Sequence, residues 1–303
     1  MQTIKRICTI TFLIVTCVSL FFYFTDTRLE GEIMWQLSRS GRGGYFLYRH
    51  IYENRVHDIE QDISDHVSFD DYTIKGNWIK DTTLSNLRSA FWFSNENSTD
   101  IVNLHHDPFP MPNNGKDWLI SHYTDYYPIT ADITKVNNYV LKFKGNGFTV
   151  VSDSMDNHWI YIVSKNVMPT KYAVEFDYYS ETAICEQLQF DIYASSLADR
   201  FRVISAYGKH VFFDAVQKGY FLKRFYEKES LMEKNTTHHI RLEVDENHIV
   251  YYVNRKKELC VSIDNYPIKQ GHLIILFWNN IDRKPININV SNFSLYTTAS
   301  TRK

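Results

Sequence analysis

The sequence predicts a mainly β fold, a sandwich of two antiparallel sheets, and three observations support this prediction. Short runs of apolar or alternating residues follow one another between residues 237 and 296, with almost no helix-like segment between them. Turn-forming residues separate these runs at short intervals. Apolar residues make up 44% of the chain and aromatic residues 16%, so the chain can bury a core.

Two successive hairpins are predicted in the first half of this stretch. Residues 239–245 alternate apolar and charged side chains, which is the two-residue period of a strand with one face on a core. The runs 248–253 and 258–263 follow, after turns at Asn247 and Asn254. Because Asn tolerates the positive φ that tight turns need, hairpins are the simplest interpretation.

The last two strands of the stretch differ in pattern. Residues 273–278 are continuously apolar, as expected of a central strand that is covered on both faces. Residues 286–296 form the final predicted strand, and its alternation slips between Val290 and Phe293. The slip predicts a bulge or bend at that point.

The first part of the sandwich is less regular. Strands are expected at 66–74, 89–94, 139–144, 147–151, 159–163 and 172–179. Residues 95–138 are interpreted as a long irregular insertion, a kind of loop that is usually either functional or disordered. The insertion is too rich in aromatic residues for a disordered segment, so we expect an ordered flap that packs on the sandwich.

Four local patterns recur in order in the second half of the chain. They are a strand of the form His-x-Ile-x-Leu-x-Val at 238–244, a hairpin reading Tyr-Tyr-Val-Asn at 251–254, an apolar strand introduced by Gly271, and a final Val-x-Asn-Phe at 290–293. This order resembles the concanavalin A-like lectin and glucanase superfamily, above all its laminin-G-type and 3-keto-disaccharide-hydrolase-like branches, over roughly residues 139–296. The chain departs from the family at Thr237 and Arg255, where members often carry Trp and Gly. The resemblance implies a jelly-roll sandwich and a carbohydrate-related role.

The N-terminus carries a predicted membrane anchor within residues 1–27. Lys5 and Arg6 precede residues 7–24, eighteen residues without a charge, which reach the lower range for a helix that spans a bilayer. A small-x-small cleavage site is missing, so we expect an uncleaved transmembrane signal anchor. The N-terminus is expected in the cytoplasm and the bulk of the chain outside it. A lipid-modified Cys17 is the alternative.

A short helical stalk is predicted at 28–64, before a single sandwich domain at 65–303. Apolar residues of the stalk recur at spacings of three and four, which places them on one helix face. They are Tyr48, Tyr52, Val56, Ile59 and Ile63. We expect this face to pack on its own domain, with a protein partner as the alternative.

The sequence holds no strong metal-binding motif, and no metal or cofactor is predicted. Imidazoles and a carboxylate occur together in His105-His106-Asp107 and could ligate a metal or exchange protons. Neighbouring residues of an extended chain point to opposite sides, so the two histidines cannot easily share one ion. A surface loop is therefore the favoured interpretation.

A paired-carboxylate motif lies in the predicted strand 172–179. Glu175 and Asp177 share one face of this strand, and retaining glycosidases need two carboxyl groups about 5–5.5 Å apart on either side of the sugar bond. Glucan-cleaving members of the superfamily carry a third acid, which would fall at residue 179 or 180. The next acid here is Glu181. No catalytic residue is therefore predicted.

A ligand-binding sheet face is the favoured functional prediction. In the strand 188–193, Gln189, Asp191 and Tyr193 lie on the side opposite the apolar residues, and Arg202 follows on the next strand. Amide, carboxylate, guanidinium and aromatic groups on a concave sheet suit sugar hydroxyls and sugar ring faces. The insertion adds further ligand-binding candidates: Trp118, His106 and Asp107.

Two cysteines lie outside the predicted anchor, Cys185 and Cys260. In an oxidising compartment they could form a disulfide, and two separate buried thiols are the alternative. The net charge of -2 gives no bias toward nucleic acid, so no nucleic-acid partner is expected.

Together these patterns predict a membrane-anchored module outside the cytoplasm that binds carbohydrate. A glycan-active enzyme of the same fold and a structural envelope protein are the alternatives. An enzyme predicts that acids or histidines from distant segments converge, for example Asp107 with Asp177 or Asp191. A binding module predicts aromatic and amide groups without such convergence.

Overall fold

The computed structural model describes the sandwich and short parts of the segment before it. The described residues are 43, 46–47, 60–61, 63–87, 91–93, 117–125, 139–152, 157–181, 186–196, 199–206, 210–217, 220–221, 225–233, 235–264, 270–279 and 286–298. The predicted anchor at 7–24 lies outside these residues, as do His106, Asp107 and Cys185. No helix within the described ranges is both long and apolar enough to cross a membrane.

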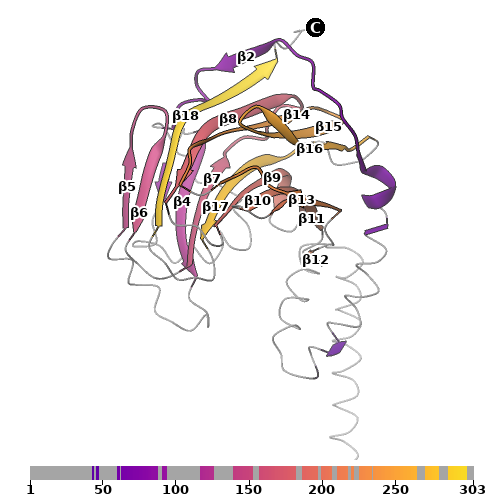
Figure 1. Cartoon of the computed structure of the whole chain (residues 1–303), viewed down its shortest axis with the longest axis horizontal. Helices are drawn as coiled ribbons and strands as arrows, with labels where there is room; N and C mark the ends of the chain where they lie inside the picture. The colour runs from indigo at the N-terminus through magenta and orange to yellow at the C-terminus, as the bar shows by residue number, and fades with distance from the viewer. Residues whose placement is uncertain are drawn as a thin grey trace, which may run out of the picture.

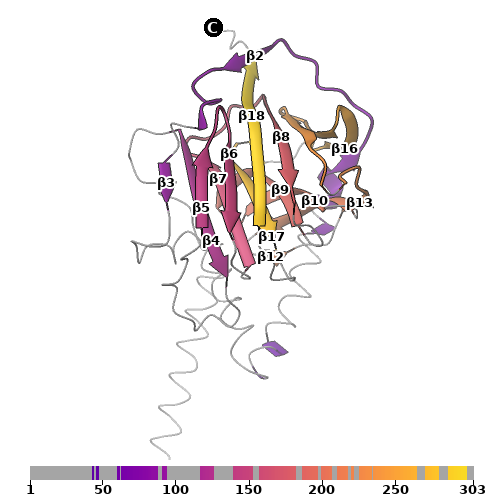
Figure 2. The same cartoon turned by 60° about the vertical axis from the view of Figure 1, so that its left-hand side comes forward.

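Two sheets pack face to face and form a β-sandwich (Figure 1). Sheet A has the strand order β1-β16-β15-β14-β8-β18-β6-β5, and β2 pairs with β18. Its strands are β1 (Ser68–Phe69), β2 (Trp78–Asp81), β5 (Tyr139–Phe143), β6 (Phe148–Ser152), β8 (Tyr172–Ser180), β14 (His238–Val244), β15 (His248–Val253), β16 (Lys256–Ser262) and β18 (Ile286–Thr298). Figure 2 shows β5, β6, β18 and β8 side by side, in front of strands of the second sheet.

Sheet B has the strand order β12-β11-β10-β9-β17-β7-β4-β3, and β13 pairs with β11. Its strands are β3 (Phe91–Phe93), β4 (Trp118–Asp125), β7 (Asn157–Ser164), β9 (Glu186–Ser196), β10 (Asp199–Ala206), β11 (His210–Gln217), β12 (Tyr220–Phe221), β13 (Tyr226–Glu229) and β17 (His272–Asn279). The pair β3–β4 is parallel, whereas the central pairs of both sheets are antiparallel. The predicted mainly β sandwich of two sheets is therefore confirmed.

Aromatic side chains from both sheets meet in the core. The ring centroids of Phe176 on β8 and Phe277 on β17 lie 6.0 Å apart, and those of Phe190 on β9 and Tyr251 on β15 lie 5.8 Å apart. All four side chains are completely buried. Burying a large apolar side chain contributes roughly 1.5–3 kcal/mol, so these contacts between the sheets are a main source of stability.

The predicted hairpins and bulge are confirmed. Strands β14, β15 and β16 pair in succession, and the turn between the last two contains Asn254 at φ 51° and Arg255 at φ 66°. The register of β18 against β8 shifts between Ser291 and Ser294, where Asn292 has φ 55°. Both features depend on local residue types, which is why the sequence predicted them.

Two early segments differ from their predictions. The insertion at 95–138 was expected to be irregular, but residues 118–125 form β4, which pairs with β7 along its whole length. Residues 66–74 were expected to form a strand, but only Ser68–Phe69 does so. In both cases pairing partners distant in sequence, rather than the local pattern, decide where the strand lies.

Residues 70–77, which follow β1, cross the outer face of sheet A before the chain enters β2 (Figure 1). Ile74 packs there on Val250 and Cys260, apart from the main core. Lys257 donates hydrogen bonds to the Asp71 carboxylate at 2.7 Å and to the Tyr72 carbonyl at 2.5 Å. The segment then leads into β2, which pairs with the C-terminal part of β18 and places Trp78 opposite Thr298.

The end of the predicted stalk packs on the sandwich. Ile63 lies in a helical segment and is completely buried in the main core. The expectation that the stalk packs on its own domain is therefore met at Ile63. The other residues of the predicted apolar face lie outside the described ranges.

Candidate functional site

Three of the predicted ligand-binding residues form a charged cluster on the outer face of sheet B. Arg202 on β10 lies in register between Asp191 on β9 and Asp214 on β11. It donates two hydrogen bonds to Asp214, from Nε at 2.5 Å and from Nη2 at 2.7 Å. Asp191 accepts a hydrogen bond from Gln189 Nε2 at 2.5 Å and lies 3.0 Å from Arg200 Nε.

This cluster is buried and its charges neutralise one another. Asp191 is 1% exposed and Gln189 is 4% exposed. Burial raises the pKa of Asp191 and lowers that of Arg200, and their mutual attraction offsets part of each effect. The predicted sugar-binding groups of sheet B thus meet one another, but they present almost no surface to a ligand in this structure.

Tyr193 and Trp118, the two aromatic residues of the predicted ligand set, lie in the core. Tyr193 has φ 55°, which breaks the alternation of β9 and turns its ring inward, where its hydroxyl donates to the Asp245 carbonyl at 2.8 Å. Trp118 is 1% exposed, and its Nε1 donates to the Leu84 carbonyl at 2.7 Å. Neither ring has a free face for a sugar.

The predicted disulfide partner Cys260 is a free, buried thiol on the outer face of sheet A. Its Sγ lies 3.0 Å from Asp70 Oδ1, and burial raises its pKa to about 12. Cys185 lies outside the described residues.

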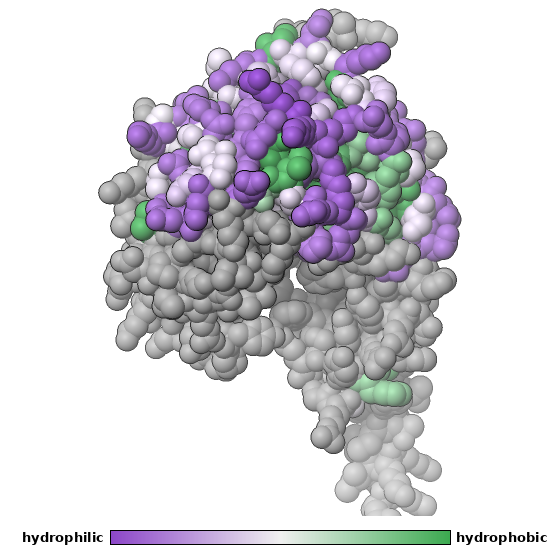
Figure 3. All heavy atoms as spheres, viewed as in Figure 1, coloured by the Kyte–Doolittle hydropathy of each residue, from purple (hydrophilic) through white to green (hydrophobic). Residues whose placement is uncertain are grey.

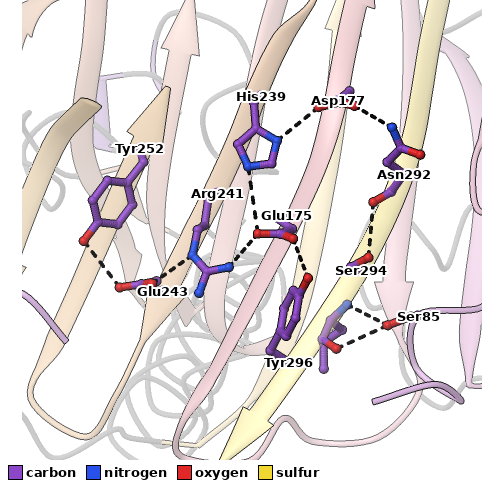
Figure 4. A network of polar contacts seen from close by, with 11 residues as sticks. Ser85, Glu175, Asp177, His239, Arg241, Glu243, Tyr252, Asn292, Ser294 and Tyr296 are labelled. Carbon is purple, nitrogen blue, oxygen red and sulfur yellow. Dashed lines mark hydrogen bonds and ion pairs between the residues drawn. The ribbon is translucent and has the colours of Figure 1, made fainter. Parts of the chain in front are cut away.

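An accessible cluster of polar and aromatic side chains lies instead on the outer face of sheet A (Figure 4). It spans four neighbouring strands and the adjoining β2. We call it the outer strip, and its members are Trp78 on β2, Glu175 and Asp177 on β8, His239, Arg241 and Glu243 on β14, Tyr252 on β15, and Asn292 and Tyr296 on β18.

Strand alternation and register bring the outer strip together. In β14 the residues Ile240, Leu242 and Val244 are buried in the core, so the residues between them face outward. Arg241 is the register partner of Tyr252 on one side and of Glu175 on the other. Side chains of directly paired residues lie close enough to interact, which places these three in one row.

Arg241 is the centre of the outer strip. Its Nε donates to Glu243 at 2.8 Å and its Nη1 donates to Glu175 at 2.6 Å. Its guanidinium carbon lies 5.6 Å from the centre of the Trp78 ring and 5.3 Å from that of the Tyr296 ring, within the range of a cation–π contact. Burial disfavours its charge, but the hydrogen bonds to the two carboxylates outweigh that effect and raise its pKa.

The second half of the strip is built around His239. Its Nδ1 lies 3.0 Å from Asp177 Oδ1 and its Nε2 lies 3.9 Å from Glu175 Oε2. The other Asp177 oxygen accepts a hydrogen bond from Asn292 Nδ2 at 2.7 Å. His239 is partly exposed and the neighbouring His238 is buried, so one ring of this pair points outward and the other inward.

The outer strip keeps part of its surface in solvent. The side chains of Glu175 and Arg241 are each 20% exposed, and that of His239 is 37% exposed. Hydrogen bonds fix the orientation of every polar group named above. The arrangement is therefore a pre-ordered set of donors, acceptors and ring edges that a ligand can reach.

The convergence that an enzyme requires, of Asp107 with Asp177 or Asp191, stays a prediction. Asp177 lies on the outer face of sheet A and Asp191 on the outer face of sheet B, with the core between them. Asp107 lies outside the described residues. Among the residues that the structure describes, no group of three or more His, Cys, Asp or Glu side chains could hold a metal ion.

Most of the outer strip was not predicted from the sequence. Of its members, the sequence singled out Glu175 and Asp177, but not Trp78, Arg241, Tyr252 or Tyr296. The alternation of 239–245 already placed Arg241 on the outer face. The Asn254 turn, which sets the hairpin register, would have placed Tyr252 beside it.

No family model matches the chain, and no curated protein matches it. Solved structures that it resembles include the carbohydrate binding module CBM66 from Bacillus subtilis, at 13% identity over 53% of this chain and 92% of that chain with a TM-score of 0.40. A β-glucanase from Bacillus licheniformis is 16% identical over 63% of this chain and 96% of that chain, with a TM-score of 0.42. Sheep galectin-11 is 15% identical over 44% of this chain and 95% of that chain, with a TM-score of 0.36. At these identities and TM-scores the likenesses carry no conclusion about a ligand.

Proposed function

We propose that this protein binds carbohydrate through the outer strip. The observation that carries the proposal is the setting of Arg241, whose guanidinium is fixed by two carboxylates and lies against two aromatic rings while staying one-fifth exposed. Sugar hydroxyls need donors and acceptors side by side, and the C–H faces of a sugar ring suit aromatic surfaces. The outer strip supplies both kinds of group.

As the ligand of the outer strip, a partner protein is less well supported than a glycan. Figure 3 shows that the described surface in this view is mostly hydrophilic, with small scattered hydrophobic areas. Protein interfaces have a core from which charged residues are depleted, whereas the centre of the outer strip is an arginine between two glutamates. A polar, partly aromatic surface suits a hydroxyl-rich ligand better.

A hydrolytic role has one supporting observation, the two carboxylates Glu175 and Asp177 on the same face of β8. Each of them already accepts hydrogen bonds from neighbouring side chains, Glu175 from Arg241 and Tyr296, and Asp177 from Asn292. A general acid has to reach the oxygen of the leaving group, whereas these two carboxylates are already engaged in contacts within the protein. Binding without cleavage is therefore the proposed activity.

We expect the Arg241→Ala variant of the full-length protein to lose most of its glycan binding. A hydrogen bond to a charged group contributes about 1.5–3 kcal/mol, which corresponds to about 10- to 100-fold in affinity. The measurement is a glycan-array screen of the wild-type protein, followed by titration of its best ligand against the variant. Incubating the same glycans for longer and looking for released sugars tests for hydrolysis.

The matched control is Lys256→Ala, which removes an exposed cation that is not a member of the outer strip, at the start of β16 opposite the buried Val253. It should bind like the wild type. Equal losses in the two variants, or intact binding in Arg241→Ala, would place the ligand elsewhere. Sugar release by the wild type would favour the enzyme instead.

We further propose that residues 7–24 anchor the protein in a membrane with the sandwich outside the cytoplasm. The support is the uncharged run of eighteen residues after Lys5-Arg6. We expect the full-length chain to resist extraction from membranes by alkaline carbonate, and a chain without residues 1–27 to become soluble. Recovery of the full-length chain in the soluble fraction would refute the anchor, and protease access from one side of sealed vesicles would give its orientation.

A further inference from the structure

We infer that the ligand of the outer strip is a neutral glycan with neighbouring free hydroxyls, and that acidic glycans such as uronates and sulfated sugars are excluded. This inference rests on the proposed binding function and adds the class of ligand. It follows from the charges of the strip, and from the hydrogen-bond donors and acceptors that the contacts within the strip do not use.

The balance of charge in the outer strip disfavours an anion. Three carboxylates lie in it, those of Glu175, Asp177 and Glu243, and one guanidinium, that of Arg241. Lys171 lies nearby, 5.9 Å from the Trp78 ring, but its Nζ donates to the Lys75 carbonyl. An acidic sugar that approached Arg241 would meet the two carboxylates that already neutralise it.

The geometry of Arg241 reinforces this exclusion. An arginine binds a carboxylate or sulfate most strongly through two parallel N–H groups. Here the Nε–H and one Nη1–H point to Glu243 and Glu175. Figure 4 shows the second terminal nitrogen with no contact to the residues drawn, so one edge of the guanidinium still has donors for an uncharged oxygen.

The carboxylates of the strip retain acceptor capacity for hydroxyl groups. Each carboxylate oxygen has two lone pairs, and Glu175 Oε1 accepts one hydrogen bond from Tyr296, at 2.5 Å, while Asp177 Oδ2 accepts one from Asn292. A hydroxyl can donate to such an oxygen and accept from the guanidinium at the same time. Two neighbouring hydroxyls on a sugar ring can therefore bridge Arg241 and Glu175, which a charged group that only accepts cannot do.

The test compares pairs of glycans that share a backbone and differ in charge, using the full-length protein in detergent. Suitable pairs are laminarin with sulfated laminarin, dextran with dextran sulfate, and methyl-esterified polygalacturonate with the free acid. For every backbone that binds, we expect the neutral member to bind at least about tenfold more tightly at low salt, where charge repulsion is least screened. The difference should shrink as salt is raised to about 1 M.

The variant Glu175→Gln/Glu243→Gln removes two of the three negative charges with little change of shape. We expect it to narrow the preference for the neutral member, while Lys256→Ala leaves the preference unchanged. Equal or tighter binding of the acidic member by the wild type would overturn the inference and leave carbohydrate binding intact. The inference would also be overturned if the Glu175→Gln/Glu243→Gln variant showed the same preference for the neutral glycan as the wild type. If the wild type bound neither member of any pair, the proposed function itself would be refuted.

Discussion

Replacing Asp191 with alanine is expected to lower the free energy of unfolding by about 3–5 kcal/mol. The change leaves Arg200 with its main counter-charge removed, at a site where the aspartate is 1% exposed and the arginine side chain is 9% exposed. It also removes the acceptor of the Gln189 amide. Equilibrium unfolding in urea, followed by circular dichroism, measures the loss.

A double-mutant cycle separates the ion pair from the other effects of the change. Arg200→Met should also destabilise the fold, because Asp191 then loses its closest cation. The variant Asp191→Ala/Arg200→Met should lower the free energy of unfolding by clearly less than the sum of the two single changes, since neither charge is left buried without its counter-charge. Strict additivity would show that the pair is not coupled.

The surface pair Asp71–Lys257 provides the contrast. Asp71 is 95% exposed, so solvent screens its attraction to Lys257, and Asp71→Ala should leave the unfolding midpoint almost unchanged. A loss as large as that of Asp191→Ala would mean that burial does not explain the difference between the two sites.

The second large effect is expected at Gly271, directly before β17. An added Cβ atom would lie 2.3 Å from the carbonyl carbon of Tyr193 and 2.6 Å from its Cα. These are backbone atoms of the neighbouring strand, which cannot move aside as the end of a side chain can. Gly271→Ala should therefore destabilise the protein by at least about 3 kcal/mol, or prevent folding, because it overpacks a buried strand pair.

Gly76 serves as the control for Gly271. A Cβ atom there would meet only side-chain atoms, the closest being Lys171 Cε at 3.1 Å. A lysine side chain can shift by a few tenths of an ångström, so Gly76→Ala should change the unfolding midpoint little. If the two variants unfold at the same urea concentration, the close approach of Tyr193 to Gly271 does not limit stability.

The close contact at Gly271 also explains why Tyr193 was misplaced by the sequence. Regular alternation would put Tyr193 on the same face as Gln189 and Asp191. The register of β17 against β9 shifts between His272 and Ile274, and Tyr193 adopts φ 55° beside this irregularity. A tyrosine at positive φ has no signature in its own sequence, because the strand next to it creates the strain.

In the candidate site, too, some features follow from the sequence of one strand and others depend on its neighbours. The outward orientation of His239, Arg241 and Glu243 could be predicted, because alternation within one strand needs no information from elsewhere. The pairing of β14 with β8, and of β8 with β18, could not be predicted from the sequence. Arg241 and Glu175, for example, are 66 residues apart, and no local pattern selects one outward carboxylate among the others.

The sequence alone determined the strands of the second half of the chain, their hairpin turns and the bulge in β18. Each of these features depends on residues that are close to one another in the sequence. Only the tertiary structure decided which outer face is open. It buries the charged row around Asp191 and Arg202, and it leaves the row around Arg241 in solvent. The reason is physical: exposure depends on what packs against a face, and the residue types of the face do not specify that.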